Sequence, residues 1–187
     1  MFGHSAIRHM PRAVMAAALL VLAAGTAAAS SLPEPVLRGT TPLEKVGGGQ
    51  LTWLGMPIYD ASLWTTSGRF TGFGPGETVA LSLWYRRSFS RDQLLSITAT
   101  AWRKLDPEST ARHREWLAEL HELWSDVAPG HNVTAVVEPG RATRFYDQRR
   151  MVGQIDDPAF GPAFLSIWLD PRSVVGDLRA QLIGAAP

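Results

Sequence analysis

The 187-residue sequence contains no cysteine. This absence excludes disulfide bonds, thiolate metal ligands, a cysteine nucleophile and a lipid anchor, which requires a cysteine at the cleavage site. The fold must therefore be stabilised by its hydrophobic core, and the chain is long enough to form one such core.

The sequence also lacks an excess of either charge. It has 18 basic residues (Lys and Arg) against 17 acidic ones (Asp and Glu), and its formal net charge is +1. A protein that binds nucleic acid through phosphate contacts normally shows a basic surface or stripe. The arginine pairs at 86–87 and 149–150 are isolated and typical of solvated loops, so we do not expect nucleic acid as a partner.

Motifs for metal, cofactor or hydrolase chemistry are missing as well. His113 and His121 are eight residues apart, too far along one helix to share a metal ion, and Ser125 occupies the place of the second histidine in a His-Glu-x-x-His pattern that begins at His121. No Gly-x-Ser-x-Gly occurs, and the glycines of residues 68–76 lack dinucleotide-binding spacing. We therefore expect no metal, no cofactor and no hydrolase triad.

The N-terminus has the organisation of a secretory signal peptide. Residues 1–12 contain Arg and His but no acid, residues 13–24 are apolar, and Ala27, Ala28 and Ala29 supply small residues before a cleavage site. The apolar run is shorter than the roughly 20 residues that span a bilayer. We expect residues 1–29 to be the signal peptide and residues 30–187 a single domain in the periplasm or secreted, without a stable membrane span after cleavage. An uncleaved N-terminal anchor is the alternative.

The remaining pattern predicts an α+β fold. Apolar alternation predicts strands at 51–54, 58–65 and 79–86, followed by a helix at 91–105 that begins with a Ser90/Gln93 capping box. A second helix is expected to open at Asp106-Pro107, followed by strands at 132–138, 142–147 and 151–155. Two further helices are expected after Asp157-Pro158 and Asp170-Pro171. This order favours one antiparallel sheet covered by helices on one face, with an interface in which a hydrophobic ligand can lodge.

Several blocks of this sequence resemble bacterial chalcone isomerase-like proteins, the exported branch of the chalcone isomerase superfamily. The matching blocks, in order along the chain, are Leu-Thr-Trp-Leu-Gly at 51–55, Tyr-Asp-Ala-Ser-Leu-Trp at 59–64, Arg-Phe-Tyr at 144–146, Gly-Gln-Ile-Asp-Asp-Pro-Ala-Phe at 153–160 and Ala-Phe-Leu-Ser-Ile-Trp-Leu-Asp-Pro at 163–171. The resemblance implies an open-faced β-sandwich, a large antiparallel sheet covered by a layer of helices.

The resemblance also implies a set of site residues. The plant enzymes of the superfamily close a chalcone into a flavanone, using an Arg and a Thr from the first strands and a Tyr, a Lys and an Asn from the first long helix region. Thr52 corresponds to the Thr and Arg38 to the Arg, whereas residues 90–102 contain no Tyr, Lys or Asn. The chain therefore resembles the non-catalytic branches, some of which bind fatty acids, and no catalytic residue is assigned.

Three residues are candidates for ligand binding. Arg38 and Thr52 could together hold an acidic or carbonyl head group, and Tyr59 could donate a hydrogen bond from its phenol. The structural alternatives are an exposed Arg38, a Thr52 with a local hydrogen bond and a Tyr59 in the core.

Three functions remain open. The first is binding of a small hydrophobic molecule such as a fatty acid. The second is an isomerase or intramolecular lyase that acts on a chalcone-type enone, and the third is a structural or interaction protein of the envelope without a ligand.

Overall fold

A computed structural model of the chain describes residues 31–185. Six antiparallel strands form one sheet in the order β1-β2-β3-β4-β5-β6, so each strand pairs with its neighbour in sequence. The strands are β1 (Glu44–Trp53), β2 (Met56–Thr65), β3 (Val79–Tyr85), β4 (Asn132–Val137), β5 (Thr143–Tyr146) and β6 (Met151–Ile155). The helices are α1 (Glu34–Leu37), α2 (Arg91–Leu105), α3 (Thr110–Leu123), α4 (Phe160–Leu169) and α5 (Gly176–Leu182). The predicted signal peptide, 1–29, lies outside the described residues.

The sheet confirms the predicted α+β fold and the alternation of β3. Leu81, Leu83 and Tyr85 face the main core, while Ala80 belongs to a smaller apolar cluster on the opposite face. Tyr59 pairs directly with Tyr85 across β2 and β3. Paired residues share one face of an antiparallel sheet, so the two phenols lie on the same side.

Two helix starts differ from the sequence prediction. The capping box of α2 is present, with Ser90 Oγ accepting from the Gln93 N–H at 3.2 Å. By contrast, α3 begins at Thr110 rather than at Asp106-Pro107, because Pro107 to Ser109 forms a turn in which Thr110 Oγ1 donates to the Pro107 carbonyl. Similarly, α5 begins at Gly176, after a turn in which the Asp170 side chain accepts from the Arg172 backbone N–H.

The glycines at 47–49 belong to β1, which begins at Glu44 rather than at the predicted residue 51. A Cβ at Gly47 would lie 2.6 Å from the Leu182 carbonyl oxygen and even nearer that of Gln181. The absence of a side chain therefore lets α5 pack directly on the backbone of β1.

The hairpin between β1 and β2 turns at Leu54 and Gly55, and both residues have positive φ, at 50° and 76°. Such turns fit the twist of a hairpin and favour Asn-Gly. Leu54 is the one non-glycine residue with positive φ in the described chain, a conformation that costs an L-residue about 1–2 kcal/mol.

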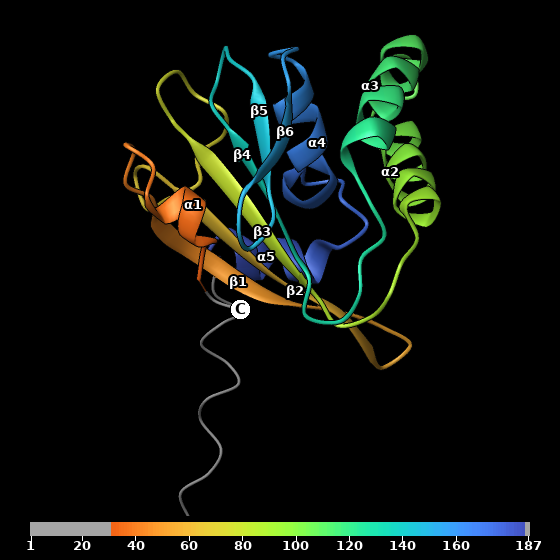
Figure 1. The fold of residues 1–187 in the computed structure, drawn as a ribbon, viewed down its shortest axis with the longest axis horizontal. Helices are drawn as coiled ribbons and strands as arrows, with labels where there is room; N and C mark the ends of the chain where they lie inside the picture. Colours follow the sequence, from red (N-terminus) through yellow and green to blue (C-terminus); the bar gives the residue numbers. More distant parts are fainter. Residues whose placement is uncertain (1–30, 186–187) are drawn as a thin grey trace, which may run out of the picture.

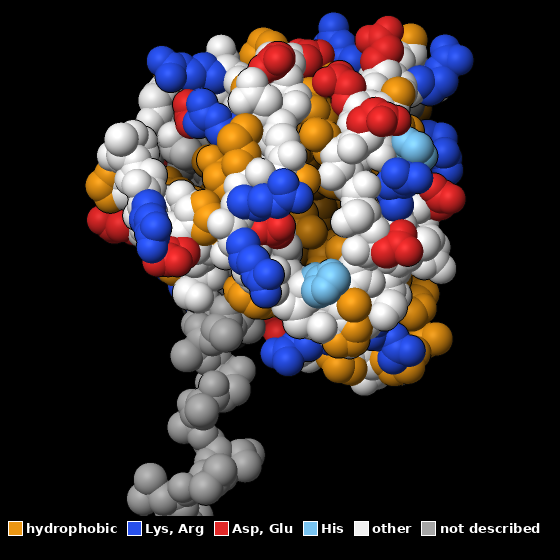
Figure 2. All heavy atoms as spheres, viewed as in Figure 1, with side chains coloured by type: hydrophobic (Ala, Val, Ile, Leu, Met, Phe, Trp, Pro, Cys, Tyr) orange, Lys and Arg blue, Asp and Glu red, His pale blue; other side chains and the backbone are white. Residues whose placement is uncertain are grey.

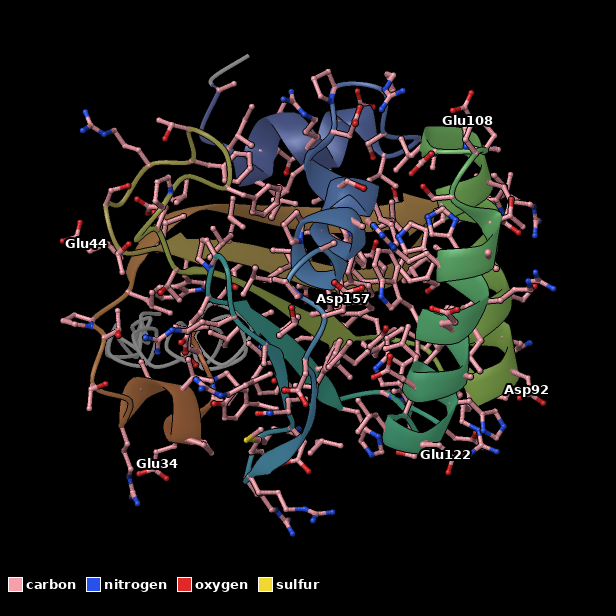
Figure 3. All side chains as sticks on the ribbon, turned by 90° about the horizontal axis from the view of Figure 1, so that it is seen from above. Glu34, Glu44, Asp92, Glu108, Glu122 and Asp157 are labelled. Atoms are coloured by element: carbon pink, nitrogen blue, oxygen red, sulfur yellow. The ribbon has the colours of Figure 1, made fainter. Side chains whose placement is uncertain are left out.

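The two faces of the sheet are covered differently. Helices α2 to α5 lie on the side of the main core, as predicted, and Figure 1 shows α2 and α3 side by side at one end of the sheet. The short α1, which the sequence analysis did not anticipate, lies on the other side, where Val36 packs with Ala80 and Val136. Figure 3 shows Glu34 of α1 across the sheet from α4 and α5. Among residues 31–185, no helix has the length and apolar character needed to cross a membrane.

Candidate functional site

A cavity of about 1270 Å³ lies between the sheet and the helices. Its walls come from residues of all six strands, of α2, α3 and α4, and of the segment at 174–175. Figure 2 shows an apolar hollow between the strands and α3. The buried or half-buried apolar side chains that line it include Leu83, Leu94, Ala101, Val127, Val133, Phe145, Phe164 and Ile167.

Two tyrosines from neighbouring strands place their phenols on the wall of the cavity. The rings of Tyr59 and Tyr85 lie 5.9 Å apart, edge to face. Tyr59 Oη accepts a 2.9 Å hydrogen bond from Nε1 of Trp168, a residue of α4. This bond holds the Tyr59 oxygen but leaves its O–H free to donate. We refer to Tyr59 and Tyr85 as the tyrosine pair.

The Tyr85 hydroxyl has no hydrogen-bond partner among the described side chains and backbone groups, although the residue is only 7% exposed. The Tyr85 oxygen is not among the fully buried side-chain atoms that lack a partner, so part of its surface is open to the cavity. The pair therefore offers two O–H donors toward one apolar space.

Both phenols remain neutral across the physiological range. Burial raises the pKa of Tyr59 to about 12, partly offset by the hydrogen bond from Trp168. Burial and the nearby Tyr59 also raise the pKa of Tyr85 above its ordinary value of 10. Each hydroxyl thus keeps its proton and can donate to a carbonyl or carboxyl oxygen.

Charged side chains on the cavity wall are all exposed or half-exposed, at its rim. They are Lys104, Glu122, Asp126, His131, Asp147, Arg149 and Arg150. Among the described residues, no Lys, Arg or His side chain forms a hydrogen bond with Tyr59 or Tyr85. The polar groups deep in the cavity are therefore neutral donors.

Another neutral donor lies on the same wall. Nε1 of Trp124 is fully buried and has no hydrogen-bond partner among the described residues. The indole packs edge to face on Phe145 at 6.1 Å and Phe164 at 5.9 Å. An indole N–H is a donor only, but this nitrogen has almost no accessible surface, so a ligand could reach it only if the surrounding rings moved.

The structure does not bring the three predicted ligand-binding residues together. Tyr59 lines the cavity. Arg38 caps the C-terminal end of α1, on the opposite side of the sheet, and forms a 2.5 Å ion pair with Glu34. Thr52 is exposed near the end of β1 and is not part of the cavity wall. Separation across the sheet prevents Arg38 and Tyr59 from binding one head group.

Sequence reasoning missed Tyr85 and Trp168 as site residues. The alternation of β3 already placed Tyr85 on the face of Leu81 and Leu83, which was the available signal. The contact between Trp168 and Tyr59 joins residues 109 positions apart, and no local pattern reports such a pairing. Among the described residues, no group of three or more His, Asp or Glu side chains could hold a metal ion.

Comparison with known proteins gives a family model and a structural relative. The model described as "Chalcone isomerase-like" matches residues 25–184. No curated protein matches the sequence significantly. The crystal structure of the fatty-acid binding protein AtFAP1 of Arabidopsis thaliana is similar, with a TM-score of 0.60 and 11% sequence identity over 78% of this chain and 88% of that one. At this identity the similarity shows a shared fold.

Proposed function

This chain belongs to the chalcone isomerase-like family, and from that premise we propose that it is a non-catalytic binder of a small hydrophobic molecule with an acidic or carbonyl head, such as a fatty acid. The observation that carries the proposal is an apolar cavity whose wall bears a pair of phenols with free O–H donors. The fold shared with a fatty-acid binding protein supports it.

The cavity has the size and lining that such a ligand requires. Ligand sites usually measure about 300–1000 Å³, with mostly apolar walls and a few polar groups that fix orientation. At about 1270 Å³ this cavity has room for a long aliphatic chain. Phenylalanine, leucine and valine side chains would pack along that chain, and burial of each methylene contributes about 0.8 kcal/mol.

The tyrosine pair would bind the head of the ligand. A carbonyl oxygen, or the protonated carboxyl of a fatty acid, can accept from both phenols without bringing a charge into the apolar space. An ionised carboxylate would require a nearby cation to offset its desolvation. We therefore expect the head to be neutral when bound next to Tyr59 and Tyr85.

We also propose that the protein acts outside the cytoplasm, in the periplasm or after secretion. The support is the sequence pattern of residues 1–29 alone. N-terminal sequencing of the protein recovered from an exporting bacterial host would test it, and a chain that retains these residues in the cytoplasmic fraction would contradict it.

Binding of a fluorescent fatty acid, measured by titration and by displacement with unlabelled ligands, tests the assignment of the head site. The variant Tyr85→Phe keeps the ring and removes the free hydroxyl, and we expect about tenfold weaker binding, equivalent to about 1.4 kcal/mol. Thr52→Val and Arg38→Ala are matched controls, because both side chains lie away from the cavity, and their affinities should equal that of the wild type.

Unchanged binding in Tyr85→Phe, or a loss confined to Arg38→Ala, would reject the tyrosine pair as the head site. Absence of any fatty-acid or enone binding would reject the proposed function itself. Turnover of a chalcone above its spontaneous rate would replace the binder with an isomerase.

A further inference from the structure

The β1–β2 hairpin ends in three exposed apolar side chains. Trp53 is 67% exposed, Leu54 83% and Met56 40%. Together they form what we call the apolar tip. Figure 1 shows this hairpin projecting beyond the rest of the sheet at the end below α2. The exposed apolar side chains therefore lie at a protruding point of the molecule, not on a flat face or in a groove.

The conformation of Leu54 indicates that this exposure is not incidental. Leu54 has a φ of 50° in a turn that favours asparagine, so it is strained, and it is almost fully exposed. The leucine gains little packing within its own chain in return. A residue that is both strained and exposed points to a contact with something outside the chain.

The charge around the apolar tip is basic. From Leu51 to Tyr59 the hairpin has no charged residue. Arg87 follows β3 and lies with Nη1 3.4 Å from the Met56 sulfur. The adjacent Arg86 is already paired with Asp60 at 2.5 Å, whereas Arg87 has no ion-pair partner among the described acidic residues. Figure 2 shows basic side chains beside the apolar atoms at the hairpin end of the molecule.

We propose that the apolar tip docks the protein on the surface of an anionic phospholipid bilayer. Tryptophan, leucine and methionine side chains insert into the interface between head groups and acyl chains, and a neighbouring arginine is attracted to anionic lipids. A protein partner is the less suitable occupant. A stable protein interface buries about 800 Å² per partner, which exceeds what three side chains on a narrow hairpin offer.

The apolar tip is continuous with the cavity wall. Trp53 lines the cavity together with Leu51 and Ile58 of the same hairpin, and the exposed Ile97 of α2 lines it as well. Docking would therefore place one rim of the cavity against the lipid. The docking inference rests on the exposure, strain and charge of the hairpin and does not require the proposed ligand.

Co-sedimentation with vesicles of phosphatidylglycerol and phosphatidylcholine tests the proposal. The protein used begins at Ser30, because the apolar residues 13–24 would themselves bind lipid, and every described helix and strand lies within it. We expect wild-type protein to sediment with the vesicles and Leu54→Asn to bind at least about tenfold more weakly. Leu54→Asn should not lower the melting temperature, because asparagine is favoured at positive φ.

Two further variants sharpen the test. Leu37→Asn makes the same substitution at another exposed leucine, which is 59% exposed at the end of α1 on the other face of the sheet. This variant should bind vesicles as the wild type does. Arg87→Glu should weaken binding about fivefold or more at low salt and have less effect at high salt.

Three results would overturn the proposal. They are wild-type protein that stays in the supernatant, Leu54→Asn that binds as tightly as wild type, and a dimer in analytical ultracentrifugation that Leu54→Asn abolishes. The last result would assign the apolar tip to a second copy of the chain.

Discussion

A single buried histidine is expected to make the stability of this protein depend on pH. His113 of α3 is 6% exposed and stacks on Trp102 at 5.0 Å with an interplanar angle of 18°. Burial lowers the pKa of His113 below its ordinary 6.5, Asp106 opposes that shift, and Arg112 adds to it. At neutral pH the folded protein therefore keeps this imidazole in its neutral form.

This shift predicts a loss of stability in mild acid. Below pH 6.5 the unfolded chain takes up a proton on His113 while the folded chain does not, so the free energy of unfolding falls as pH decreases toward the lowered pKa. His113→Phe keeps the stacking and should reduce that dependence, by at most about 1.4 kcal/mol per pH unit. Urea unfolding between pH 7.5 and 5 measures it.

The half-exposed His121 supplies the control for this measurement. His121→Gln removes a histidine from the same helix without touching the stack of His113 on Trp102, so an effect that both variants share would not come from the buried position. Equal pH dependence in wild type and His113→Phe would show that His113 is protonated equally easily in both states, contrary to the expectation.

The sequence could predict a candidate site residue only where the alternation of a strand determines the face of the sheet on which the side chain lies. Tyr59 lies on an alternating strand and on the cavity wall, while its oxygen accepts from Trp168 within the core, so its position fits both sequence alternatives. Arg38 and Thr52 were assigned by resemblance, and their placement depends on tertiary structure. Arg38 directly follows a four-residue helix that packs on the far face of the sheet, and nothing in the spacing between Arg38 and Thr52 specifies a face.

At the scale of elements, α5 can pack against β1 only because residue 47 of β1 is a glycine. A side chain at Gly47 would collide with the backbone carbonyls of Gln181 and Leu182. We expect Gly47→Ala to push α5 away from the strand and to destabilise the protein by about 1–3 kcal/mol, measured by chemical denaturation.

Gly74 provides a matched control in a loop. Its added Cβ would meet nothing within 4 Å, and Gly74→Ala should be neutral or slightly stabilising because it restricts the unfolded chain. Equal free energies of unfolding for Gly47→Ala and Gly74→Ala would contradict the close packing of α5 on β1.

The elements themselves were largely predictable. Alternation in β3 and the capping box of α2 are signals within a few residues, and both elements formed as expected. Gly47 to Gly49 of β1 have no side chains to alternate, so this part of the strand depends on pairing with β2 and on cover from α5. The dipeptides Asp106-Pro107 and Asp170-Pro171 begin turns instead of helices, because Asp-Pro is favourable in both settings.

For the whole molecule, the proposed ligand should raise thermal stability. A ligand that binds only the folded state stabilises it by about 2.7 kcal/mol at a concentration of 100 Kd. For a domain of this size we expect the melting temperature to rise by about 5–10 °C with a saturated or monounsaturated fatty acid, measured by calorimetry.

Val133→Trp is the variant that separates binding in the cavity from surface association. Val133 lies on β4 and faces the cavity, so the larger indole should fill part of the space that the acyl chain needs. The increase in melting temperature should disappear in this variant. An equal increase in both proteins would place the fatty acid elsewhere on the molecule.

The packing of α5 on β1 has a consequence for the order in which the chain is synthesised. The first strand is made early, but the helix that covers its glycines comes from the last ten or so described residues. Strands that pair with their sequence neighbours can form locally, whereas the contact between α5 and β1 must close a loop that contains almost the whole domain. A nascent chain on the ribosome therefore cannot complete this fold until α5 has emerged, and loss of α5 would leave β1 uncovered on its inner face.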